Sequence, residues 1–373
     1  MSRRLRIAFI AIVLFAALAA LGFFAVSRIP ALRAGVMTPL VFFNFLVQDG
    51  AWRPLEVLTP SPRRERTVLE SPSGRRLDAA LWIPARARGP APAAVIYTPF
   101  IGGGLEDPRL KNLAETFARA GIVSLAFWRD RDPLVASPKD IDDVVAAFRF
   151  LQQHPSVRPD AVGLVGISYG AGPALVAAAR PEIRDAVSFV MSHAGYYDLE
   201  NVLRFIVTGE YEYGDIRGKL EPNRYGHEIL SRTLEALGVD DATAKNFTES
   251  PQDFDENFER LPRLRELVER LSPSEVAGEL RAEHVYIIHA TDDTFIPYTE
   301  SLRLRDAFTR LSFAGQNLGG RAGRLQVRFQ LIDIFEHGTP RPPTIENLRR
   351  HWIPNLAKSI GFLYALLRET YAL

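Results

Sequence analysis

The sequence predicts an α/β protein with a mostly parallel sheet and helices on both faces. Short apolar runs alternate along the chain with longer segments of helical period. Such strand and helix alternation is typical of a parallel sheet that is covered on both sides. A single interruption of about 90 residues breaks this alternation, and we expect it to form a separate helical cap.

The expected elements follow in chain order. Residues 67–83 contain two strand-like runs separated by "SPSG", which predicts a β-hairpin. Six apolar runs predict the remaining strands: residues 93–100, 121–127, 161–168, 186–194, 284–290 and 327–333. Apolar residues at helical spacing predict helices over residues 110–120, 141–154 and 356–369, the last packed on the sheet. Together these elements predict one domain over residues 67–373.

The long interruption lies between the strands that end near Ala194 and begin near His284. It carries the helical patterns "LENVLRFIV", "YGHEILSRTLEALG" and "LPRLRELVERL". An insertion of this length in a compact α/β unit needs structure of its own. We therefore expect a helical cap at about residues 196–280.

The first thirty residues have the pattern of a membrane segment. Three arginines precede an uncharged apolar stretch from Ile7 to Val26, which is long enough to cross a bilayer. Residues 1–30 therefore predict a transmembrane anchor, with the N-terminus in the cytoplasm and the folded domain outside it. The small residues "ALA" at 17–19 leave a cleaved signal peptide and a secreted protein as the alternative.

Residues 31–66 are predicted as a juxtamembrane segment and linker. Within them, "TPLVFFNFLVQ" begins with a plausible N-cap at Thr38, and lies either at the membrane interface or as a helix on the domain. From Arg53 to about Arg66 the chain is rich in Pro and Arg without periodicity, which is typical of a linker.

The composition excludes several classes of function. The net charge is +1 and basic residues are spread along the chain, so no nucleic-acid surface is predicted. The absence of cysteine rules out disulfides, thiolate nucleophiles and sulfur-based metal sites. The sequence has no P-loop, dinucleotide fingerprint or histidine motif for zinc. We expect no cofactor and no metal.

Residues 166–170, "GISYG", form a G-x-S-x-G pattern between a strand and a helix-forming run. A strand that turns sharply into a helix holds its serine in a strained conformation with the hydroxyl exposed at the helix N-terminus. Helix N-termini favour negative charge, so the backbone N–H of Tyr169 is a candidate oxyanion donor beside Ser168. This context predicts that Ser168 is a nucleophile.

A base and an acid are found downstream. "HVYIIHATDDTFIPY" is a strand that ends in a turn with two aspartates, and "RFQLIDIFEHGTP" is a strand that runs out at His337. The chain order serine, acid, histidine is that of the α/β-hydrolase arrangement. Each candidate follows a predicted strand, where active sites of open α/β sheets lie.

These segments together resemble the α/β-hydrolase superfamily, in particular its esterase, dienelactone-hydrolase-like and prolyl-oligopeptidase-like members. In that resemblance the second aspartate of "ATDDTFIP" is the triad acid, which points to Asp293. Ala290 stands where the family segment usually has glycine. Three other carboxylates lie nearby in the sequence: Asp292 is expected to bond its own turn, Asp198 occupies the acid position of some relatives, and Glu336, adjacent to His337, is expected to point elsewhere.

The second oxyanion donor is expected in the loop "TPFIGGG" after the strand at residues 93–100. Pro99 has no N–H, which leaves the backbone of Phe100 or Ile101 as candidates.

The predicted function is carboxylic ester hydrolysis through an acyl-enzyme, with a small-molecule ester as substrate, and the expected membrane anchor favours a lipophilic one. Two alternatives remain open at this point: a serine peptidase of the prolyl-oligopeptidase-like type, and a non-catalytic binding protein on a hydrolase fold.

Overall fold

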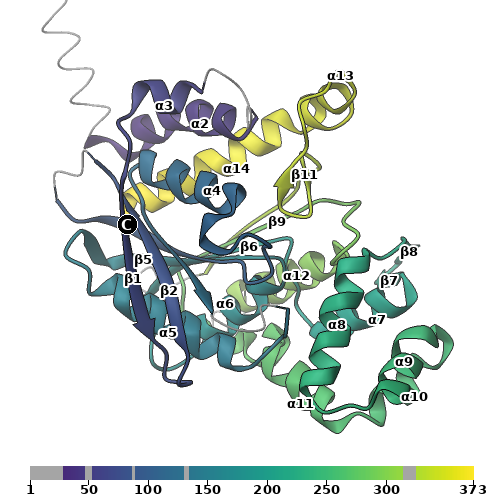
Figure 1. Cartoon of the computed structure of the whole chain (residues 1–373). Helices are drawn as coiled ribbons and strands as arrows, with labels where there is room; N and C mark the ends of the chain where they lie inside the picture. The colour runs from purple at the N-terminus through teal and green to yellow at the C-terminus, as the bar shows by residue number, and fades with distance from the viewer. Residues whose placement is uncertain (1–27, 47–52, 86–88, 130–133, 314–324) are drawn as a thin grey trace, which may run out of the picture.

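A computed structural model describes residues 28–46, 53–85, 89–129, 134–313 and 325–373 (Figure 1). Its centre is an eight-stranded sheet with the order β1-β2-β4-β3-β5-β6-β9-β10. The strands are β1 (Arg63–Glu70), β2 (Arg76–Ile83), β3 (Ala91–Tyr97), β4 (Val123–Arg129), β5 (Val157–Ile167), β6 (Val187–His193), β9 (His284–His289) and β10 (Gln326–Leu331). Each of the strands expected from the sequence is present.

The sheet is parallel except at one edge. β2 runs antiparallel to both β1 and β4, and the pairs from β4 to β10 are parallel. The first two strands form the predicted hairpin, with the turn at residues 71–75. The predicted α/β class with a mostly parallel sheet is confirmed.

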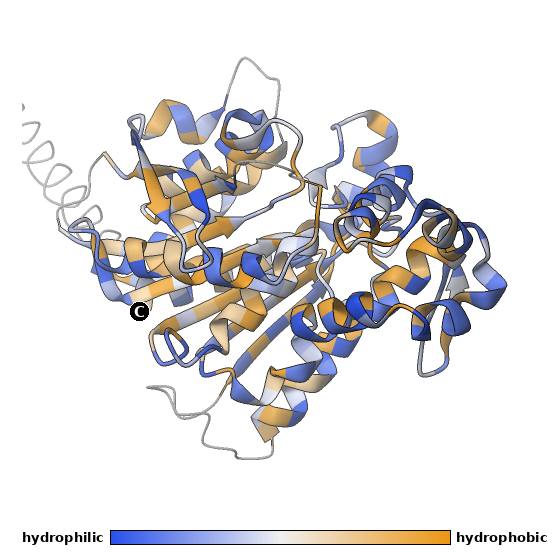
Figure 2. Cartoon of the chain, turned by 60° about the horizontal axis from the view of Figure 1, so that its bottom comes forward, coloured by the Kyte–Doolittle hydropathy of each residue, from blue (hydrophilic) through white to orange (hydrophobic). Residues whose placement is uncertain are grey.

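Helices cover both faces of this sheet (Figure 1). One face carries α5 (Lys139–Gln152), α6 (Ala171–Ala178) and α12 (Thr299–Phe313). The opposite face carries α2 (Pro30–Leu46), α4 (Pro108–Arg119) and α14 (Ile353–Ala372). Because the central strands are buried on both sides, they are apolar along most of their length, as the hydropathy colours of Figure 2 show.

The cap lies between β6 and β9. It contains α7 (Leu199–Thr208), α8 (Arg224–Ala236), α9 (Asp241–Glu249), α10 (Phe254–Glu259) and α11 (Pro262–Leu271). A small hairpin of β7 (Glu210–Tyr213) and β8 (Ile216–Lys219), which the sequence did not lead us to expect, separates α7 from α8. Cap residues such as Phe247 and Leu264 belong to the same apolar core as α5 and α6, so the cap packs on that side of the sheet.

The N-terminal elements differ from the expected linker. α2 begins at Pro30 rather than near Thr38, and it packs against α14 through Val41 and Phe42. Further on, the short helix α3 (Pro54–Leu58) buries Leu55 completely, and β1 begins at Arg63. Of the two alternatives for the stretch from Thr38, packing on the domain is therefore the one observed.

The membrane prediction is corrected. The apolar stretch from Ile7 to Val26 lies outside the described residues. Among the residues that are described, no helix has both the length and the apolar character needed to cross a bilayer. α2 and α14, which carry long apolar runs, pack on each other and on the sheet through part of those runs, and several apolar residues of both helices are exposed. For the described residues, the prediction of a single-pass membrane protein is therefore wrong.

Candidate active site

Ser168 lies at the point where β5 turns into a helix. β5 ends at Ile167, one short helical turn covers Ser168–Gly170, and α6 follows directly. The backbone of Ser168 has φ +57°, in the left-handed region that costs a non-glycine residue about 1–3 kcal/mol. His337 has the same kind of strain, with φ +42°.

The two glycines of "GISYG" are required by close packing. A Cβ added to Gly166 would lie 2.4 Å from the Cα of Ala171, and one added to Gly170 would lie 2.4 Å from the carbonyl oxygen of Tyr97. Both contacts are with backbone atoms, which cannot move without shifting α6 in the first case and β3 in the second. Only glycine allows the turn at Ser168 to approach β3 and α6 this closely.

The structure brings Ser168, His337 and Asp293 together. Ser168 Oγ lies 2.7 Å from His337 Nε2, and His337 Nδ1 lies 2.9 and 2.8 Å from the two carboxylate oxygens of Asp293. A carboxylate only accepts hydrogen bonds at neutral pH, so Nδ1 carries the proton and Nε2 is left to accept the serine hydroxyl proton. The ring of Phe295 stacks on His337 at 3.9 Å between centroids.

Asp293 is held by more than His337. Its side chain is 1% exposed, and Oδ1 accepts the backbone N–H groups of Phe295 and Ile296 at 2.8 and 3.1 Å. His289 Nε2 lies 3.3 Å from Oδ2. Burial opposes ionisation, but His337 and His289 outweigh it and hold the pKa of Asp293 well below its usual value. Asp293 is therefore ionised, as a carboxylate, at every pH at which proteins usually function.

His289 is a site residue that the sequence analysis did not single out. It is fully buried, its Nε2 lies 2.9 Å from the carbonyl oxygen of Ile296, and its Nδ1 lies 2.7 Å from Ser301 Oγ. Because a carbonyl only accepts, Nε2 carries the proton, which also faces Asp293. The available signal was its position four residues before Asp293.

The other carboxylates have different partners. Asp292 pairs with Arg341 at 2.7 and 2.6 Å, and Glu336 lies 3.8 Å from the same guanidinium. Asp198 accepts the backbone N–H of Glu200 and caps α7. Asp292 was expected to bond its own turn, but Asp293 makes those bonds. The first aspartate points outward to Arg341 because the second one fills the turn.

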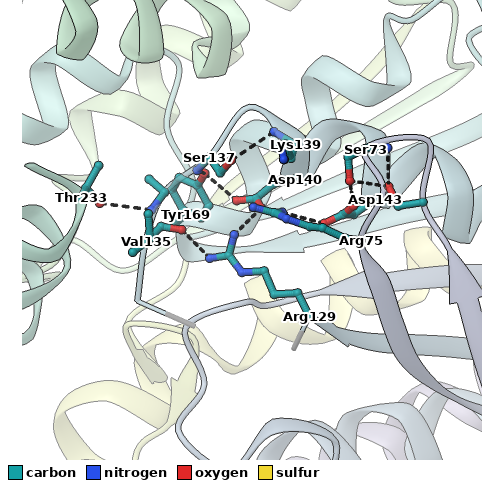
Figure 3. A network of polar contacts seen from close by, with 12 residues as sticks. Ser73, Arg75, Arg129, Val135, Ser137, Lys139, Asp140, Asp143, Tyr169 and Thr233 are labelled. Carbon is teal, nitrogen blue, oxygen red and sulfur yellow. Dashed lines mark hydrogen bonds and ion pairs between the residues drawn. The ribbon is translucent and has the colours of Figure 1, made fainter. Parts of the chain in front are cut away.

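A buried polar network holds the residue after the serine (Figure 3). The Tyr169 hydroxyl donates to Asp140 Oδ2 at 2.8 Å and accepts the backbone N–H of Ser137 at 3.1 Å. Asp140 is fully buried and also pairs with Arg129 and, at 2.6 Å, with Arg75. Desolvation raises the pKa of Tyr169 well above its usual value, so the phenol stays a donor.

The expected oxyanion residues lie around the serine. Phe100, Ile101 and Tyr169 all line the cavity that contains Ser168. The ring of Phe100 stacks on that of Tyr169 at 4.7 Å, and the Phe100 carbonyl accepts the Tyr225 hydroxyl at 3.0 Å. The loop after β3 is thus fixed to both the serine turn and the cap.

Ser168 opens into a large apolar cavity of about 570 Å³, which we call the main cavity. Its walls come from the ends of β5, β6 and β9, from the loop after β3, and from α2, α4 and α14. His193 lies in this wall, and burial together with the nearby imidazoles of His289 and His337 lowers its pKa to about 3. In the described part of the chain, no group of His, Asp and Glu residues is arranged to hold a metal ion.

The sequence matches the family model described as X-Pro dipeptidyl-peptidase (S15 family) over residues 73–296. The chain belongs to the S15 family. The matched part of this S15 chain includes Ser168 and Asp293 but ends before His337. Family and fold together class the chain with the serine hydrolases of the α/β-hydrolase type.

Solved structures and curated relatives match this S15 chain only in part. The acylaminoacyl peptidase of Pyrococcus horikoshii has a TM-score of 0.54 at 15% identity, covering 86% of this chain and 44% of that one. A "Probable 2-oxo-3-(5-oxofuran-2-ylidene)propanoate lactonase" of Bradyrhizobium sp is 34% identical over 112 residues, which is 26% of this chain and 44% of the lactonase. A polyketide transferase of Penicillium crustosum is 33% identical over 128 residues, 32% of this chain and 41% of the transferase. The chain thus spans less than half the length of these proteins.

Proposed function

We propose that the protein hydrolyses carboxylic esters through an acyl-enzyme on Ser168. The observation that carries the proposal is the unbroken hydrogen-bonded chain from Ser168 Oγ to His337 and on to Asp293, with 2.7 Å between the serine oxygen and His337 Nε2. A serine, a base and an orienting carboxylate in this order are the parts that acyl transfer needs.

In the proposed reaction, Ser168 Oγ attacks the ester carbonyl carbon while His337 Nε2 takes the hydroxyl proton. The C–O bond to the leaving alcohol then breaks, and His337 returns the proton to that oxygen. Water repeats the sequence on the acyl-serine, releases the carboxylic acid and restores Ser168. Asp293 keeps His337 in the tautomer with its proton on Nδ1 and stabilises the imidazolium that forms.

The oxyanion of each tetrahedral intermediate is assigned to backbone N–H groups. Tyr169 follows the nucleophile at the start of a helical segment, where N–H groups have no partner in the preceding turn. The second donor is Phe100 or Ile101 of the loop after β3, on the cavity wall. The link from Tyr169 to Asp140 holds the first donor in place.

The cavity lining favours esters over peptides with a free N-terminus. Among the described residues that line the main cavity there is no Asp or Glu, and the only cations are Arg53 and Arg109. A buried ammonium group needs a carboxylate or equivalent partner, which this wall does not supply. A peptidase of the prolyl-oligopeptidase-like type is the second candidate, because the S15 family match favours it.

The proposal is tested by labelling the purified protein with a fluorophosphonate and by comparing p-nitrophenyl esters with peptide p-nitroanilides. We expect labelling and ester hydrolysis in the wild type, and loss of both in Ser168→Ala, with a fall in kcat of about 10⁴-fold or more. Ser231→Ala, which changes an exposed serine on α8, is the matched control. Faster cleavage of anilides than of esters would favour the peptidase. No labelling of the wild type would favour a non-catalytic protein.

A further inference from the structure

We propose that the main cavity binds a long aliphatic acyl chain, so that the substrates are long-chain esters. This inference rests on the proposed ester hydrolysis and names its substrate class. The cavity begins at Ser168 and His337 and continues between the sheet and the helices on the face opposite α5 and α6. Its deep wall is formed by apolar side chains of three helices: Phe42 and Phe45 of α2, Leu113 and Phe117 of α4, and Leu363 and Leu366 of α14.

The deep wall is mostly carbon, and its few polar residues bond largely to the protein, with Arg53 Nε as a buried group that has no hydrogen-bond partner among the described residues. The Ser359 hydroxyl donates to the carbonyl oxygen of Asn355 at 2.8 Å. Asn112 Oδ1 accepts from Arg53, and the Arg53 guanidinium also pairs with Glu56. A ligand group in the deep part of the cavity therefore meets methyl, methylene and aromatic carbon. Such a wall attracts an aliphatic chain and disfavours a peptide backbone, whose N–H and C=O groups would lose their hydrogen bonds.

Two cavities open at Ser168, and they differ in volume. A second pocket, under the cap and next to Tyr196 and Leu203, has only about 70 Å³. The main cavity, at about 570 Å³, falls in the usual range of ligand sites, roughly 300–1,000 Å³. The larger group of the substrate must occupy the larger space. We assign it to the acyl part, because the acyl group stays on Ser168 after the alcohol has left.

Two of the three helices that form the deep wall lie outside the family match, and only α4 lies within it. α2 lies before residue 73 and α14 lies after residue 296, and these two helices pack on each other. The inference therefore assigns chain-length specificity to the terminal helices of this chain, while the nucleophile and the acid lie in the matched part.

The test is a series of p-nitrophenyl esters from acetate through butyrate and octanoate to dodecanoate. We expect kcat/KM of the wild type to rise along the series, by up to about fourfold for each methylene that becomes buried. Leu363→Trp fills the deep cavity from α14, so the ratio of kcat/KM for dodecanoate to kcat/KM for acetate should fall at least about tenfold. Ile360→Trp, one turn away on the exposed side of α14, should behave as the wild type does.

A second measurement needs no variant. The rate at which fluorophosphonates inactivate the wild type should increase with the length of their alkyl chain. This measurement tests the inference even if the Leu363→Trp protein does not fold. Hydrolysis of acetate without any gain for longer chains would overturn the inference and leave the proposed function standing. A preference for dodecanoate that survives in Leu363→Trp would overturn it as well. If the wild type cleaves no ester and takes no label, both the function and this inference fail.

Discussion

Asp293 lies within reach of two imidazoles, His337 on the side of the nucleophile and His289 at 3.3 Å between Nε2 and Oδ2. His289 touches neither the serine nor the cavity wall that leads to it, so it acts through Asp293. Its own orientation is fixed by Ser301 and by the carbonyl of Ile296. We infer that His289 is a positioning residue for the carboxylate.

His289→Phe keeps a ring of similar size and removes the donor that faces Asp293. We expect kcat for an ester to fall about tenfold to a hundredfold with little change in KM, since the carboxylate loses part of its support. His289→Gln, which retains a donor, should recover part of the rate at an unchanged KM. A kcat equal to that of the wild type in His289→Phe, or a loss that His289→Gln does not reduce, would contradict the positioning role.

Asp293→Asn and Asp292→Asn form a matched pair of neighbours. The first removes the charge that holds the His337 tautomer, and kcat should fall by about 10⁴-fold. The second removes only an outward pair with Arg341 and should leave kcat nearly unchanged. Steady-state kinetics on a p-nitrophenyl ester measure both. The reverse order of effects would assign the acid role to Asp292.

Asp140→Asn tests the network beneath the serine turn. The Arg129 side chain is 3% exposed, and it loses the charge of its buried partner in this variant. Removing one member of a buried pair costs about 3–5 kcal/mol of the free energy of unfolding. Glu256→Gln breaks the exposed pair with Arg260 on the cap and should change stability little. Urea unfolding of the three proteins compares them, and equal midpoints would refute the buried role.

Glu300 gives the protein a dependence of stability on pH. Its side chain is 1% exposed and accepts the backbone N–H groups of Tyr197 and Asp198 at 3.1 and 2.8 Å, which ties α12 to the start of the cap. Burial raises the pKa of Glu300 to about 7, from a usual value of 4.5. Between these two values the folded state holds a proton that the unfolded state has lost, so stability falls as pH rises through this window.

The size of this effect is about 3 kcal/mol once the pH is above 7. Glu300→Gln keeps an acceptor for both N–H groups and cannot ionise. We therefore expect this variant to lose that part of the pH dependence, measured as the free energy of unfolding at about pH 5 and about pH 8. If the wild type and the variant lose stability equally between the two pH values, Glu300 is not the titrating group.

Much of the site was predictable because its signals are local. The turn at Ser168 requires small residues before and after the serine, and the close approach of Gly166 to Ala171 and of Gly170 to Tyr97 shows why. The aspartate pair at 292–293 and His337 were candidates because each follows a strand of a parallel sheet, and the resemblance to the α/β-hydrolase superfamily pointed to Asp293 of that pair. These patterns need only a few neighbouring residues and can be recognised in the sequence.

The N-terminal prediction was less successful. The run from Thr38 to Gln48 is apolar, which suits a membrane interface and a protein core equally well. The described part of this run, up to Leu46, belongs to α2, which packs against α14 more than 300 residues away and so joins the protein core. Tertiary structure likewise decided which of the two aspartates faces inward. Asp293 does so and bonds its own turn, while Asp292 faces outward and pairs with Arg341.

The sequence by itself determined the order of strands and helices, the strained serine between glycines, and the order of the serine, the acid and the histidine. These features depend on local periodicity and on backbone sterics, which the residues encode directly. Tertiary structure decided the shape of the main cavity, the support of Asp293 by His289 and the link from Tyr169 to Asp140. Each of these joins segments far apart in the chain, so their contacts exist only after the sheet and its helices have packed.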